Sequence, residues 1–309
     1  MPARTELFVR KQPGGMFSVV NQGHTTGNIF FVNSATGTNG VGYGQNPDAP
    51  FASIHYASTQ CTANNGDRIY VMPGHVETVI GAGGLALAVA GVEVIGIGQG
   101  GSRPTVTLTT STAATVTISA ANVTVRNILF VGGIDALVSV LVISAADVSL
   151  IDCEYRDTSA MQCGDCILTT AAANRLKIQN FIYTGDTAAG TNAGIAIVGG
   201  DRILIDGLRM DGNFAVGGID IRTTATTNLE VRNVWSFRTR NSADIFIIDT
   251  ITASTGQIGP NVNLRLQDNA ANITEACTGA TFVYIQPINI VNLAGESSMQ
   301  TNITASTDA

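Results

Sequence analysis

Charged side chains are scarce in this sequence. They make up 13% of the 309 residues, about half the usual share for a soluble globular protein. Lys11 and Lys177 are the only lysines, and short β-branched residues, Gly, Ala and Asn take the place of long helix formers. The net charge of −7 argues against a nucleic-acid partner. The composition therefore indicates a β-rich protein that does not bind nucleic acid.

Long apolar runs and an even set of cysteines are also missing. No run reaches the roughly 18 residues of a membrane span, and the N-terminus lacks the apolar core of a signal peptide, so we expect no membrane partner. The odd number of cysteines argues against a disulfide framework. The Cys163-x-x-Cys166 pair has no second pair or histidines near it in sequence, as a zinc site would require. We therefore predict no metal and no cofactor.

What the sequence does contain is an internal repeat. Five segments alternate apolar and polar residues between two Asn or Asp positions, and each then meets a further apolar pair. Their first residues are spaced by 25, 27, 27 and 27 positions and are Asn122, Asp147, Asn174, Asp201 and Asn228. Alternation marks a strand with one buried face, and Asn or Asp marks a bend because both accept left-handed backbone.

Three short strands with their bends use about 25 residues at roughly 3.3 Å per residue. A coil of this kind buries its inner face only when it stacks on other coils. The repeat thus predicts an all-β fold, a right-handed single-stranded parallel β-helix with coils of about 25–27 residues. A doubly wound α/β fold needs amphipathic helices between strands, and a β-sandwich does not predict the steady spacing.

The two ends differ from the body. Residues 50–62 place Phe51, Ile54, Ser58 and Cys61 on one helical face, which predicts an N-terminal capping helix. After residue 242 we expect a longer spacing, because Asn261 follows Asn228 by 33 residues. We therefore divide the chain into an arm (1–28), a capping segment with the β-helix (29–242), and C-terminal coils with a cap or oligomerisation segment (243–309).

Residues 30–57 and 65–78, with Pro50–Ile54 and the Gly-Asp-x-Ile-Tyr-Val-x-Pro-Gly pattern at Gly66–Gly74, resemble the entrance of the pectate-lyase-like β-helix superfamily. Over about residues 28–309 the chain more closely resembles β-helix virion proteins of tailed bacteriophages. The matching stretches are 61–79, 89–100, 115–127, 192–200, 211–231, 269–284, 291–296 and 303–309. This resemblance implies a structural component of a phage particle, a homotrimer, located on the head or on the tail.

Many enzymes of this fold cleave acidic polysaccharides, so the carboxylates need weighing. A lyase needs Ca²⁺-binding carboxylates and a base, and the nearest candidates are Asp147, Asp152, Glu154 and Asp157. A hydrolase could draw on Asp201, Asp206, Asp211 and Asp220. Several of these occupy bend positions, for which a structural role is sufficient. We therefore assign no catalytic residue and interpret Asn122, Asp147, Asn174, Asp201 and Asn228 as coil corners.

Two further features bear on partners. The arm carries Arg4, Arg10 and Lys11 against one acid, which fits docking on a capsid surface. The only tryptophan, Trp235, is expected at the surface, as an interface or glycan contact, with Arg222, Arg232, Arg238 and Arg240 near it in sequence. We expect a non-enzymatic, trimeric capsid decoration protein of the virion that binds the major capsid protein. The alternative is a tailspike or fibre that binds or depolymerises host polysaccharide.

Overall fold

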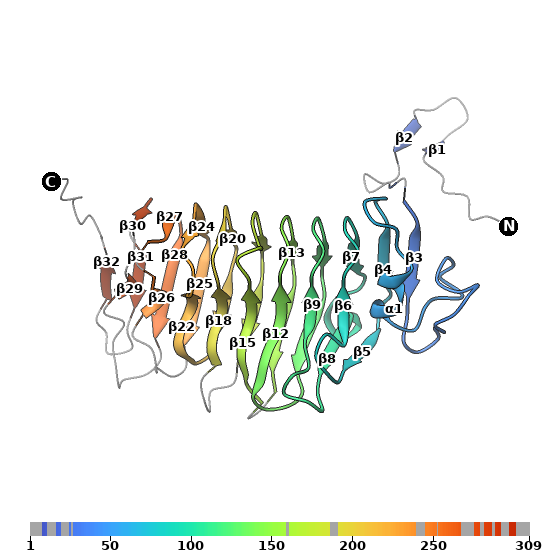
Figure 1. The fold of residues 1–309 in the computed structure, drawn as a ribbon, viewed down its shortest axis with the longest axis horizontal. Coiled ribbons are helices and arrows are strands. Elements are labelled where there is room, and N and C mark those ends of the chain that lie inside the picture. The colour runs from blue at the N-terminus through green and yellow to red at the C-terminus, as the bar shows by residue number, and fades with distance from the viewer. Residues whose placement is uncertain are drawn as a thin grey trace.

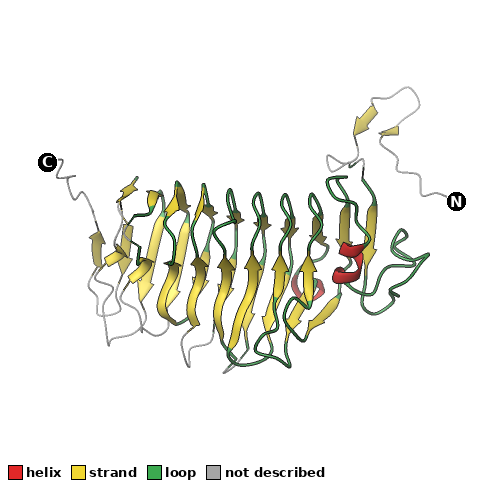
Figure 2. Ribbon diagram, in the orientation of Figure 1, coloured by secondary structure: helices red, strands yellow, loops and turns green. Residues whose placement is uncertain are grey.

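The protein is seen in a computed structural model that describes residues 8–10, 17–19, 25, 27–158, 161–185, 191–238, 245–251, 253–266, 275–278, 281–285, 288–291 and 297–300. The described strands form three long sheets that run side by side along one rod (Figures 1 and 2). Within each sheet the neighbours are parallel, apart from the antiparallel last pair β31–β32. The fold is a parallel β-helix, which confirms the predicted fold class.

Each full coil contributes one strand to each sheet in turn. Sheet 1 contains β3 (Ile29–Val32), β4 (Arg68–Val71), β7 (Glu93–Gly96), β10 (Thr124–Arg126), β13 (Ser149–Ile151), β16 (Lys177–Gln179), β20 (Leu204–Asp206), β24 (Leu229–Arg232), β27 (Thr255–Ile258) and β30 (Thr281–Tyr284). Sheet 2 contains β5 (Val76–Val79), β8 (Thr105–Leu108), β11 (Leu129–Gly132), β14 (Glu154–Asp157), β17 (Ile182–Thr184), β21 (Arg209–Asp211), β25 (Val234–Arg238), β28 (Val262–Leu266), β31 (Ile288–Val291) and β32 (Ser297–Gln300). Sheet 3 contains β6 (Leu85–Leu87), β9 (Val116–Ile118), β12 (Leu137–Ile143), β15 (Cys163–Thr169), β18 (Thr191–Ile197), β22 (Phe214–Ile221), β26 (Ile245–Asp249) and β29 (Glu275–Thr278).

Ladders of identical or similar side chains fill the rod. On sheet 3, Leu141, Ile167, Ile195, Ile219 and Ile247 pair in register from coil to coil, and each is at most 1% exposed. Burial of such apolar area contributes roughly 25 cal/mol per Å². The stack is therefore held by its inward rows, which leaves the outward rows free to carry other chemistry.

The bends between sheets use left-handed backbone, although not always at the predicted residue. Asn122, Asp147 and Asn228 have φ values of 58°, 59° and 54°. In the other two coils the left-handed residue is Arg175 (φ 56°) or Arg202 (φ 55°), one position after Asn174 or Asp201. The core ladder fixes the register of the strand, since Ile178 lies opposite Leu150 in the sheet. Ile178 follows Asn174 by four residues, whereas Leu150 follows Asp147 by three, so the connection before Ile178 has an extra residue.

The spacing does not lengthen after residue 242. Asn261 has φ 60° and donates through its side chain to the Asn233 side chain at 2.9 Å, so it continues the second bend of the coil. The 33 residues between Asn228 and Asn261 therefore separate two different bends of the coil, and not equivalent ones. The three sheets continue across residue 242. The division of the chain at that residue stays a prediction.

The capping helix is shorter than predicted. Helix α1 spans Ile54–Thr59, and the Ser53 side chain caps it by accepting from the backbone N–H of Tyr56. The helix therefore begins after Pro50 and Phe51, which were included in the predicted range. Helix α1 lies near the N-terminal end of the rod (Figure 1), and its Ile54 and Ala57 are buried in the core. No helix among the described residues has both the length and the apolar character to cross a membrane.

In the predicted arm, β1 (Phe8–Arg10) and β2 (Phe17–Val19) form an antiparallel pair. Arg10 is the last residue of β1. Arg4 and Lys11 lie outside the described residues. The docking role of the arm therefore stays a prediction.

Candidate functional site

The carboxylates proposed for a lyase are held by structural partners. Arg175 donates two hydrogen bonds of 2.6 Å to Asp147 and lowers the pKa of that carboxyl. Asp152 accepts from the Asn180 side chain at 2.9 Å. Glu154 pairs with Arg103 at 2.6 Å. These pairs join each carboxylate to the next coil or, for Glu154, to a residue two coils earlier, which gives the carboxylates a structural role.

The hydrolase candidates do not converge. Asp206 ends a strand of sheet 1, Asp211 ends one of sheet 2, and Asp220 lies on sheet 3. Asp201 accepts hydrogen bonds from the side chains of Asn228 and Thr227 at 2.8 Å, and these hydrogen bonds lower its pKa. The four carboxylates are thus dispersed over different faces of the rod.

One pair of carboxylates does meet, and the sequence did not identify it. Arg222 bridges Asp220, at 3.1 Å, and Asp165, which comes from a coil two turns earlier. The two carboxylate side chains are 4% and 8% exposed. Burial raises the pKa of both Asp165 and Asp220, against the lowering effect of Arg222. These carboxylates are buried beneath the outer face of sheet 3.

Cysteines and histidines form no reactive centre in the described part of the chain. Cys163 and Cys166 are free thiols that are almost fully buried, and burial raises the pKa of each. His75 accepts from the backbone N–H of Ser34 through Nδ1 at 3.0 Å and contacts Glu77 through Nε2 at 3.2 Å. No group of three or more His, Cys, Asp or Glu side chains is placed to hold a metal ion among the described residues.

Trp235 is 48% exposed on β25, whereas the preceding Val234 is fully buried. Its register neighbours are Arg209 on one side and Asn263 on the other. A shallow hollow of about 430 Å³ lies beside it, with Gly207 and Asn233 in its lining. The exposed indole face and the adjacent hollow keep Trp235 a candidate contact residue.

The arginines near Trp235 in sequence turn to other faces. Arg222 serves the buried pair on sheet 3. Arg232 binds Asp206 at 2.9 Å and Glu230 at 2.5 Å, both on sheet 1. Nothing is described of the Arg238 side chain, and Arg240 lies outside the described residues. Arg222 and Arg232 thus stabilise the stack, whereas Arg209 on the neighbouring strand lies beside the indole.

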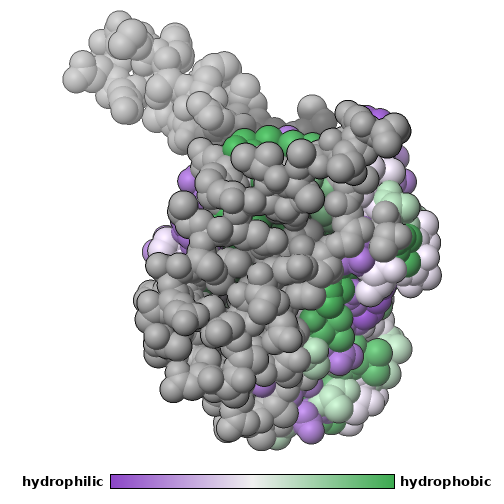
Figure 3. Space-filling model, turned by 90° about the vertical axis from the view of Figure 1, so that its left-hand side faces the viewer, coloured by the Kyte–Doolittle hydropathy of each residue, from purple (hydrophilic) through white to green (hydrophobic). Residues whose placement is uncertain are grey.

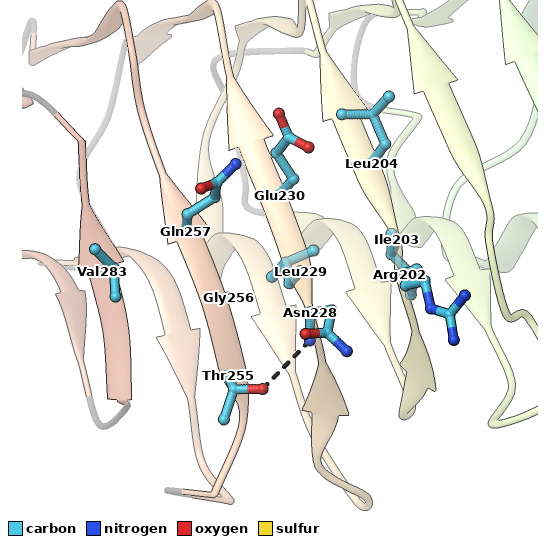
Figure 4. A pocket seen from close by; sticks show the side chains of 10 residues that line it. All are labelled: Arg202, Ile203, Leu204, Asn228, Leu229, Glu230, Thr255, Gly256, Gln257 and Val283. Carbon is cyan, nitrogen blue, oxygen red and sulfur yellow. Dashed lines mark hydrogen bonds between the residues drawn. The ribbon is translucent and has the colours of Figure 1, made fainter.

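A second hollow lies on the outer face of sheet 1, towards the C-terminal end of the rod. It has a volume of about 800 Å³ and crosses four successive strands, β20, β24, β27 and β30 (Figure 4). We call it the sheet 1 groove and define it by Arg202, Leu204, Asn228, Glu230, Gln257 and Val283. Of these, sequence reasoning considered only Asn228. The repeat is the sequence signal that could have identified the others, because Glu230 and Gln257 are one coil apart in register.

The groove presents polar groups between two apolar ones. Leu204, Glu230, Gln257 and Val283 form one continuous row in register, and Figure 4 shows Glu230 and Gln257 projecting side by side. Seen from the C-terminal end of the rod, the coloured residues show hydrophilic and hydrophobic side chains interspersed (Figure 3).

Comparison with known proteins shows the fold only. No family model matches the chain, and no curated protein matches it. One solved structure that it resembles is a rhamnogalacturonan lyase, with a TM-score of 0.53 and 13% sequence identity over 78% of this chain and 73% of that chain. At this identity the likeness supports a parallel β-helix and assigns no activity.

Proposed function

We propose that this protein is a structural component of a tailed-phage virion, a homotrimer that decorates and reinforces the capsid by binding the major capsid protein. The observation that carries this proposal is the use made of the candidate lyase carboxylates. Asp147 and Asp152 each bind a side chain from the next coil, and Glu154 binds Arg103 from two coils earlier. An enzyme would present such carboxylates to its substrate, whereas here they pair with side chains of the rod itself.

The resemblance to phage virion proteins and the arm give the proposal its location. Arg4, Arg10 and Lys11 supply positive charge ahead of an acidic body, which suits contact with an acidic capsid surface. The ladders of sheet 3 give the rod the stability that a virion exterior demands. Trimerisation would place three such rods at a three-fold position of the lattice.

The direct test is a reconstruction of the intact particle at a resolution that traces chains. We expect the β-helix at three-fold or quasi-three-fold capsid positions, with residues 1–28 across capsid subunits. A variant with Arg4, Arg10 and Lys11 changed to Glu should lose particle binding, while a Lys177→Glu control should retain it. Density at the tail tip, or a monomer absent from purified particles, would refute the proposal.

A second candidate function is polysaccharide cleavage, favoured by the pair Asp165 and Asp220. A carboxyl group whose pKa is raised by burial can serve as a general acid, and Arg222 sits between the two carboxylates. The low exposure of both side chains opposes this role, because a glycosidic oxygen must reach the acid. An Asp220→Asn variant that lost measurable cleavage of host polysaccharide, beside an active Asp206→Asn control, would establish it.

A further inference from the structure

We propose that the sheet 1 groove binds a neutral oligosaccharide. This function is separate from attachment to a capsid, because the groove lies on the outer face of the coils and does not involve the arm. It rests on the shape of the groove, on the balance of its charges and on one amide that the fold does not use.

The shape suits a short extended chain. The groove crosses four coils, and coils stack at about 4.8 Å, so it offers similar contact positions at each step along the rod. Its volume of about 800 Å³ lies within the usual range of ligand sites. Asn228 and Thr255 lie side by side along one margin, where the Asn228 backbone N–H donates to the Thr255 hydroxyl at 3.3 Å (Figure 4).

The two charged residues of the groove are each paired within the protein. Arg202 is paired with Asp201 at 2.9 Å, and Glu230 is paired with Arg232 at 2.5 Å. A strongly anionic or cationic ligand would have to displace one of these partners. A ligand rich in hydroxyl groups would not, since each hydroxyl both donates and accepts.

The unused group is the Gln257 side chain. It makes no hydrogen bond to the residues that the structure describes, it is half-buried, and it stands between Glu230 and Val283 in the outward row. An amide offers two donors and an acceptor, while the second oxygen of Glu230 can accept. Leu204 and Val283 supply apolar contacts for the C–H groups of a sugar ring at the two ends of this row.

Binding is measured on the full chain with short oligomers of glucose, mannose, galactose and rhamnose, and with galacturonate oligomers as the acidic probe. We expect at least one neutral oligomer to bind. Gln257→Ala should weaken that binding roughly ten-fold through lost hydrogen bonds. Gln257→Arg should abolish it, because the guanidinium can pair with the adjacent Glu230 and fill the groove.

Gln179 provides the matched control. It lies on the outer face of the same sheet, outside the groove, with an acid, Asp206, as its register neighbour. Gln179→Ala and Gln179→Arg should bind like the unmodified chain, and circular dichroism of all variants checks folding. The proposal is overturned if no neutral oligomer binds, if galacturonate is preferred, or if Trp235→Ala abolishes binding while both Gln257 variants retain it. Particle attachment is scored separately, so either proposal can fail alone.

Discussion

Glu77 should stabilise the N-terminal end of the rod more than any ordinary surface acid. It lies on β5 and is 8% exposed. Its Oε2 accepts from the backbone N–H of Ile54 at 2.7 Å, and its Oε1 accepts from that of His55 at 3.3 Å. These two N–H groups open helix α1, which has no acidic residue in its own first turn. Glu77 therefore caps a helix from a distant strand.

The expected cost of Glu77→Ala follows from these contacts. A hydrogen bond to a charged group contributes about 1.5–3 kcal/mol, and the longer bond to His55 belongs at the low end of that range. Loss of the carboxylate also leaves the buried His75 ring without its Nε2 partner. Some water will reach the freed N–H groups, so we expect a net loss of about 2–4 kcal/mol in the free energy of unfolding.

Glu93→Ala is the matched control. Glu93 is on β7 of sheet 1, and its carboxylate pairs with Arg68 at 3.0 Å while remaining 24% exposed. Surface ion pairs of this kind contribute about 0–1 kcal/mol. Denaturant unfolding gives the two free energies, and hydrogen exchange at the Ile54 and His55 amides reports the helix directly. Equal losses in the two variants, with unchanged exchange at those amides, would refute the capping role.

Three further changes test the core, the buried ion pair and the pH dependence. Ile195→Ala should cost about 2–5 kcal/mol of unfolding free energy. Val138→Ala should cost little, because the Val138 side chain is 63% exposed. Arg222→Met should lower the free energy of unfolding by an amount towards the lower end of about 3–5 kcal/mol. It leaves two buried carboxylates without their arginine partner, but the Arg222 side chain is itself 31% exposed. Asp147 has a lowered pKa when folded, so its stabilisation is present above its unfolded pKa of about 4 and is lost as the pH falls through the lower folded value. The difference in melting temperature between the unmodified chain and Asp147→Asn should therefore shrink in acid, and a constant difference would contradict this assignment.

The fold was predictable from the sequence because its determinants repeat. Inward residues such as Leu150 and Ile178 recur at a fixed spacing, and a stack is the only arrangement that buries all of them. The exact corner residue was less predictable at Asn174 and Asp201. There an inserted residue leaves the core ladder in place and moves the left-handed backbone onto the following arginine. Asn174 still serves the bend, since its side chain accepts from the Asp201 backbone N–H at 2.9 Å.

The candidate sites were less predictable, because they depend on which outward residues become neighbours. Asp165 and Asp220 are 55 positions apart in the sequence and meet only through Arg222. Gln257 is hard to recognise in the sequence as a neighbour of Glu230, because aligning Asn261 with Asn228 instead of Asn233 displaces the last coils by several residues. Glu77 carries no local signal of its capping role, since its partners lie in a helix more than 20 residues earlier.

The separation of inward and outward rows explains why the same repeat reveals the fold and conceals the function. An inward position is constrained by its equivalents in the coils on either side, so its side chains stay similar. An outward position has no such constraint, and a binding surface arises where successive coils differ. The row Leu204, Glu230, Gln257 and Val283 changes character at each step, whereas Ile167, Ile195, Ile219 and Ile247 on sheet 3 do not change at all. Ligand sites on this rod should therefore be sought where the outward rows depart from the repeat, and on this criterion the sheet 1 groove is a stronger candidate than any coil corner.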